Sequence, residues 1–146
     1  MQRIGCEVYS PCYTAGMADA IYPEAKDAFM SGSIDVTTDN LKIVCVSSSY
    51  TYSAAHVDEA DLAGILGESA AFQATVTAGV LDFADVTITG IDTGETVAAY
   101  ILYKDTGTPA TSPLIAYKDS AAELPLAGTT GVDVIVVVNA AGFFTL

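Results

Sequence analysis

The sequence predicts a mainly β protein: an antiparallel β-sandwich or small barrel of about seven or eight short strands with one short N-terminal helix. Three observations lead to this fold class. From Asn40 onward, apolar side chains recur with a period of two. Turn-forming Gly, Asp, Thr and Pro residues separate these segments. Ahead of them, residues 21–30 have the spacing of a helix.

The predicted helix has a start signal and a stop signal. Asp19 is a candidate N-cap, Pro23 and Glu24 fit the first turn, and Gly32 can end the helix. The apolar face would consist of Ile21, Ala25, Ala28 and Phe29. A second, shorter helical turn is expected within residues 56–67, with Asp58 or Asp61 as its cap and with Leu62, Ile65 and Leu66 facing inward.

The predicted strands follow the alternation and the turn residues. They cover residues 41–46, 72–77, 80–83, 85–89, 96–104, 113–117, 132–138 and 143–146. The fifth and sixth of these form a β-hairpin within residues 99–119.

The strand over residues 96–104 is apolar on both faces, so both faces must be covered. Such a strand is either central in a sandwich with something packed outside it, or it lies at a contact between subunits. The candidate interface residues are Val97, Tyr100, Ile101, Leu102 and Tyr103.

Length and composition fit one domain, expected over residues 17–146, with an extended N-terminal arm over residues 1–16. Of the 146 residues, 51% are apolar, yet no uninterrupted apolar run reaches the roughly 18 residues of a membrane span. The apolar excess indicates buried subunit contacts or, alternatively, an alanine-rich monomer core.

The charge is strongly acidic, with 18 Asp and Glu against 5 Lys and Arg and a formal net charge of −13. Nucleic acid and anionic membranes are therefore not expected as partners, because both are bound by clustered basic residues. High negative charge does favour solubility at high local concentration.

The triplet Asp-Thr-Gly occurs at Asp92 and again at Asp105, and aspartic proteases carry this triplet on their catalytic loops. Only 13 residues separate the two, which places them at turns of one small sheet. Asp and Gly are also the residues that tight turns favour, so we interpret both triplets as turns. An aspartic-type protease stays an alternative.

Other chemistry has little support in the sequence, and we expect no catalytic residue, cofactor or metal. His56 is the single histidine and no serine has the surroundings of a nucleophile elbow. The three cysteines and His56 lack zinc-ligand spacing. Asp82 and Asp85 are a weak calcium candidate, because no loop has carboxylates at alternate positions.

The three cysteines divide into two kinds. Cys45 lies in a predicted strand and is expected to be buried. Cys6 and Cys12 lie in the arm, where they can pair with each other or with neighbouring subunits. Thiols are expected in the cytosol, and disulfides in an extracellular particle.

Four segments carry a resemblance to known proteins: residues 17–32, 50–56, 103–107 and 110–117. They resemble a family of small virion proteins of tailed bacteriophages, and the resemblance extends over most of residues 17–146. Residues 1–16 precede the point where similar chains begin. Residues 137–142 replace a Trp-Asp-Asn-Gly stretch that similar chains often carry.

The resemblance implies a non-enzymatic head decoration (cement) protein on the capsid surface of the virion, assembled in the host cytoplasm. Its partners would be the major capsid protein and further copies of itself in a symmetric oligomer such as a trimer. Alternatives are a tail, neck or fibre component, the protease, and a sugar-binding sandwich module that would use Tyr50, Tyr52 or Tyr100.

Overall fold

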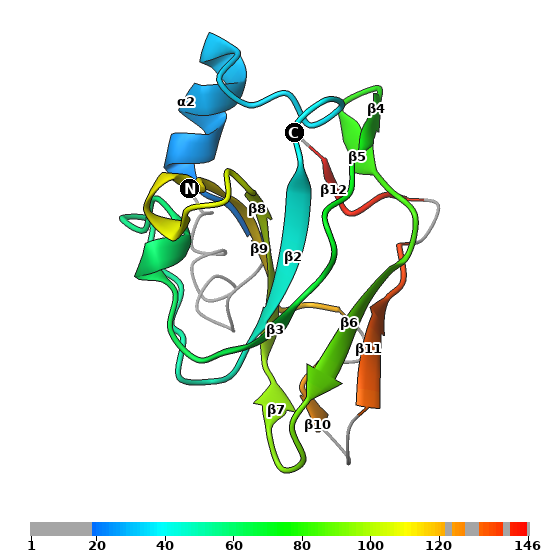
Figure 1. Ribbon diagram of the computed structural model, residues 1–146. Helices are drawn as coiled ribbons and strands as arrows, with labels where there is room; N and C mark the ends of the chain where they lie inside the picture. The colour runs from blue at the N-terminus through cyan, green and yellow to red at the C-terminus, as the bar shows by residue number, and fades with distance from the viewer. Residues whose placement is uncertain (1–18, 122–123, 128–131, 139–140, 146) are drawn as a thin grey trace, which may run out of the picture.

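The computed structural model describes residues 19–121, 124–127, 132–138 and 141–145. Within them lie one α-helix, two 3-10 helices and twelve short strands (Figure 1). The helices are α2 (Pro23–Ser31), η2 (Glu59–Asp61) and η3 (Pro109–Thr111). The strands are β1 (Ala20–Ile21), β2 (Leu41–Val46), β3 (Ile65–Glu68), β4 (Thr75–Thr77), β5 (Val80–Asp82), β6 (Val86–Ile91), β7 (Thr96–Val97), β8 (Ala99–Lys104), β9 (Leu114–Lys118), β10 (Leu126–Ala127), β11 (Val132–Val136) and β12 (Phe144–Thr145). The mainly β class with one N-terminal helix is confirmed, although the strands are shorter and more numerous than predicted.

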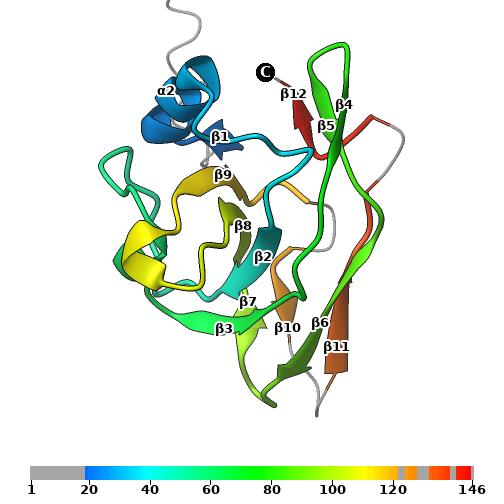
Figure 2. The same ribbon diagram turned by 45° about the horizontal axis from the view of Figure 1, so that its top comes forward.

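The largest sheet is antiparallel and has the strand order β1-β9-β8-β2-β3. A bridge between Ser69 and Ile88 links the end of β3 to the β6–β11 ribbon. Smaller sheets are formed by β4, β5 and β12 and by β7 and β10. In both views the β4–β5–β12 sheet and the β6–β11 ribbon lie on one side of β2, while α2 and the 3-10 helices lie on the other (Figures 1 and 2).

Strand β8 lies at the centre of this arrangement, between β2 and β9. The five candidate interface residues, in β7 and β8, are each at most 1% exposed in the single chain, so they offer no surface to a second subunit. The strand is apolar on both faces because it is central in the domain. The prediction of a subunit interface is therefore corrected: the residues belong to the core of the chain, namely Val97, Tyr100, Ile101, Leu102 and Tyr103.

The β8–β9 hairpin forms as predicted, with Ile101 opposite Tyr117. Its loop is held by Ser112, which is fully buried. The Ser112 hydroxyl donates to the Thr108 carbonyl at 2.9 Å and accepts from the Thr106 N–H at 3.1 Å. Because the hydroxyl both donates and accepts a hydrogen bond, its burial carries only a small free-energy cost, which explains why a serine can be buried at this position.

Two local predictions need correction. Tyr22, not Asp19, is the N-cap of α2, because Asp19 lies ahead of β1; Gly32 does end the helix, with φ +77°. Only residues 59–61 of the second helical segment are helical, with Asp58 as cap and Asp61 closing the capping box. Ile65 belongs to strand β3 and is 45% exposed rather than inward.

Substitution of Gly142 by alanine should lower the free energy of unfolding by about 2–3 kcal/mol. Gly142 has φ +81°, and an added Cβ would contact the Val80 side chain and lie 2.8 Å from the Leu81 carbonyl oxygen. Gly32→Ala is the matched control, because its φ is +77° but nothing lies within 4 Å of the added Cβ. We expect a loss of about 1 kcal/mol there. Equal losses in urea unfolding of the two variants would contradict the steric explanation.

Candidate functional site

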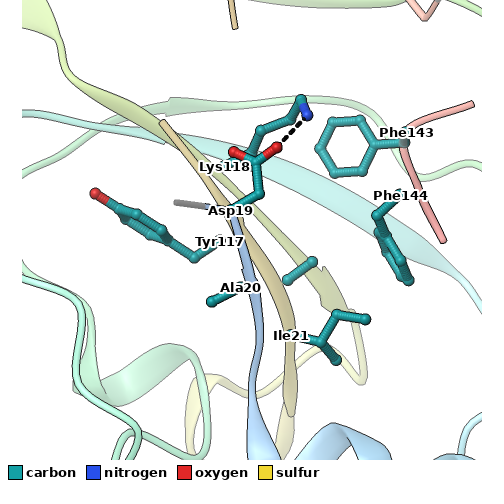
Figure 3. A pocket seen from close by; sticks show the side chains of 8 residues that line it. Asp19, Ala20, Ile21, Tyr117, Lys118, Phe143 and Phe144 are labelled. Carbon is teal, nitrogen blue, oxygen red and sulfur yellow. Dashed lines mark hydrogen bonds and ion pairs between the residues drawn. The ribbon is translucent and has the colours of Figure 1, made fainter. Parts of the chain in front are cut away.

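A pocket of about 260 Å³ lies between the edge of the large sheet and the chain before and within β12 (Figure 3). Strands β1 and β9 form one wall, and Phe143 and Phe144 form the other. Ile21 and Phe144 line it with apolar surface, while Asp19 and Lys118 lie together at one end (Figure 3). The pocket is therefore an apolar hollow with one charged end.

At the charged end of the pocket, the Asp19 carboxylate is bound by groups of the same chain. The Lys118 Nζ donates to Asp19 Oδ2 at 2.6 Å and lies 5.6 Å from the centre of the Phe143 ring. Ser120 donates to the same carboxylate through its backbone N–H and its hydroxyl. Burial of the Asp19 carboxyl on its own raises its pKa, but the hydrogen bonds from Lys118 and Ser120 outweigh burial and leave the pKa below its ordinary value.

A cluster of tyrosine rings occupies the region around Tyr117. The Tyr117 ring centre lies 5.3 Å from that of Tyr52 and 6.1 Å from that of Tyr50, and Tyr52 packs 5.1 Å from Tyr22. The Tyr22 and Tyr50 hydroxyls are 2.7 Å apart, and the Tyr50 hydroxyl is 2.8 Å from His56 Nδ1. Burial is the main cause of a raised pKa for Tyr22 and raises that of Tyr117 to about 12.

This cluster differs from a sugar-binding platform, which needs exposed ring faces. Tyr50 is buried and Tyr100 is fully buried in β8, so of the three predicted residues only Tyr52 is partly exposed. His56 has a bonding partner within the cluster, which fits the structural role expected for a lone histidine.

A second charged group, which the sequence did not indicate, joins β2, β3 and β8. The Lys42 Nζ contacts Glu68 Oε1 at 2.8 Å and Asp105 Oδ2 at 3.3 Å, and Tyr103 donates to Glu68 Oε2 at 2.9 Å. The hydrogen bond to Glu68 is the main cause of a raised pKa for Lys42. Burial, followed by the charges of Glu68 and Asp105, raises the pKa of Glu59.

The two Asp-Thr-Gly triplets lie at opposite ends of the β7–β8 stretch, so Asp92 and Asp105 cannot share a proton within one chain. The turn interpretation is confirmed. The Gly107 N–H donates to Asp105 Oδ1 at 2.9 Å, and the Glu95 N–H donates to the Asp92 carbonyl across the first turn at 3.3 Å.

The metal and cysteine predictions have different outcomes. The described residues contain no group of three or more His, Cys, Asp or Glu side chains that could hold a metal ion. Asp85 of the weak calcium candidate instead accepts from the Val138 N–H at 3.0 Å. Cys45 is buried as predicted, and burial raises the pKa of its thiol to about 12. Cys6 and Cys12 lie outside the described residues.

Strand β11 of the β6–β11 ribbon and the residue that follows it expose large apolar side chains. Ile135 is 55% and Val137 is 65% exposed, whereas the alternate residues Val134 and Val136 are buried. Successive side chains of a strand point to opposite faces, which explains why buried and exposed residues alternate here. Among the described residues, no helix has the length and apolar content to cross a bilayer.

Comparison of the chain with protein-family models, with curated proteins and with solved structures finds no match.

Replacement of Lys118 by methionine should raise the pKa of Asp19, because burial then acts against only the Ser120 hydrogen bonds. The folded-state pKa of Asp19 in the native protein lies below that of the unfolded chain. The ion pair therefore adds stability above the unfolded pKa, and this stability is lost as the pH falls through the folded pKa. At pH 7 we expect a loss of about 1 kcal/mol.

The measurement is an NMR titration of the Asp19 carboxyl carbon, together with urea unfolding at pH 7. Lys26→Met is the control, because Lys26 is an exposed lysine of α2. An unchanged Asp19 titration in Lys118→Met would contradict the assigned cause.

Proposed function

We propose that the chain is a non-enzymatic structural protein of a bacteriophage particle and that it decorates the outer surface of the capsid. The observation that carries the proposal is the exposed apolar pair formed by Ile135 of β11 and Val137, the first residue after that strand. The major capsid protein is proposed as the partner of this surface. The support for that choice is the resemblance to phage virion proteins, which is carried by residues 17–32, 50–56, 103–107 and 110–117.

The ribbon is suited to contact another protein. Two neighbouring large apolar side chains, both more than half exposed, gain free energy when a partner covers them, at about 25 cal/mol per Å² of apolar area. The buried residues Val134 and Val136 fix the opposite face of β11 to the domain, so Ile135 is held on a paired strand, and Val137 follows directly after the end of that strand.

The charge of the chain fits a protein present in many copies. A net charge of −13 keeps the protein soluble at high local concentration. On a capsid, a modest contact at each site adds up over many symmetry-related sites, and a symmetric oligomer such as a trimer would engage several sites at once. Clamping of neighbouring capsomers would follow from such contacts.

The direct test is a cryo-electron microscopy map of the purified particles, with the copy number measured by quantitative mass spectrometry. We expect many copies at regular positions on the head. Density at the tail, neck or fibre alone, or absence of the chain from purified particles, would contradict the decoration role.

A surface variant tests the contact itself. Ile135→Lys with Val137→Lys should abolish binding of the purified protein to particles that lack it, because two charges would be buried in an apolar contact. Met30→Lys is the control, since Met30 is an exposed apolar residue of α2 outside the ribbon. Sedimentation with particles measures binding, and equal binding of both variants would remove the ribbon as the contact.

A further inference from the structure

A groove of about 420 Å³ separates helix α2 from the surface formed by η2 and η3, on the side of the molecule away from the β6–β11 ribbon. One wall is a single stripe of α2. Glu24, Asp27, Ala28 and Ser31 line the groove, and their spacing of three and four residues places them on the same helical face. The stripe combines two carboxylates with a small apolar residue.

The opposite wall is held firmly by the backbone. Asp58 and Pro113 form an isolated β-bridge, and the Leu114 N–H donates to the Val57 carbonyl at 2.9 Å. Val57 is 42% exposed and lines the groove, as do the partly exposed Pro113 and the buried Ile34. The groove thus has an apolar lining between two rigid walls.

Three carboxylates surround this lining: Glu24 and Asp27 on the helix and Asp58 on the facing wall. Glu24 and Asp27 are a like-charged pair at a spacing of three, which is unfavourable in an isolated helix. No ion pair joins any of the three to a lysine or arginine among the described residues.

The lysines of the described chain form no ion pair with these three carboxylates, although the Lys104 Nζ donates to the carbonyl of Ser33, which lines the groove, at 2.9 Å. Lys42, Lys104 and Lys118 form ion pairs with other carboxylates. Lys26 belongs to α2 but is one and two residues from Asp27 and Glu24, so it projects from a different helical stripe. The negative charge of the groove is therefore not compensated by these lysines.

We propose that this groove binds the side chain of an arginine or lysine from an extended segment of a partner protein. The aliphatic stem of such a side chain would lie along Val57, Ile34 and Ala28, and its charged end would reach the carboxylates of Glu24, Asp27 and Asp58. A second copy of this chain is a poor occupant, because its net charge is −13 and three of its five basic residues are already paired.

This inference deepens the proposed function, since it names the chemistry of a partner segment that a structural particle protein would engage. The two proposals fail separately. A chain found on the head that shows no response to an arginine probe would remove the groove alone, whereas a chain absent from particles that binds the probe would remove only the decoration role.

The test uses the full-length chain, labelled with ¹⁵N, and N-acetyl-arginine amide as the probe. We expect saturable chemical-shift changes at Ala28, Ile34 and Val57, with a dissociation constant on the order of 1–10 mM for the isolated side chain. N-acetyl-citrulline amide, which has the same shape without the charge, should bind at least about fivefold more weakly, a difference of about 1 kcal/mol.

A matched pair of variants separates the groove from general electrostatic attraction. Glu24→Gln with Asp27→Asn should weaken arginine binding about fivefold or more. Asp82→Asn with Glu95→Gln changes the net charge equally at exposed positions outside the groove and should leave binding unchanged. Shift changes spread over the surface, equal effects of the two variants, or equal binding of arginine and citrulline probes would each overturn the proposal. The probe comparison needs only the native chain, so it decides the question even where a variant fails to fold.

Discussion

The burial of β8 on both faces is the constraint on which the rest of the structure depends. Tyr100, Ile101 and Leu102 are fully enclosed by the chain itself, and β8 is hydrogen-bonded to β2 on one side and β9 on the other. The hairpin that follows fixes β9, and β9 in turn positions β1, the Asp19–Lys118 ion pair and the tyrosine cluster. Because both faces of β8 are covered by the chain itself, any surface that binds a partner must lie outside this core.

Two peripheral surfaces of different character follow from this arrangement. The end of the β6–β11 ribbon presents Ile135 and, directly after β11, Val137, which are uncharged and suited to a dry contact. The groove beside α2 presents carboxylates around an apolar lining and is suited to a basic side chain. In a shell-binding protein with both surfaces, the apolar surface would contribute mainly affinity. The acidic groove would contribute mainly specificity for where the partner segment docks.

Local patterns in the sequence predicted what local forces determine. The alternation in Leu41–Val46 gave the bounds of β2, Gly32 ended α2, and the turns at Asp92 and Asp105 formed as expected. Long-range pairing was beyond the reach of these patterns. Asp19 resembled a helix cap, yet it bonds to Lys118, 99 residues away, and this pairing exists only once β1 has joined β9. The groove beside α2 likewise forms only when residues 57–58 and 110–113 are brought to the helix.

Hydrogen exchange of the β8 amides at decreasing protein concentration tests the central claim most directly, that the two-sided core of β8 is satisfied within one chain. The amides of Tyr100, Ile101 and Leu102 should be among the slowest to exchange, with rates unchanged over a hundredfold dilution into the range where sedimentation shows a monomer. Exchange at these amides that accelerates on dilution would contradict the claim, because it would mean that a second subunit covers β8.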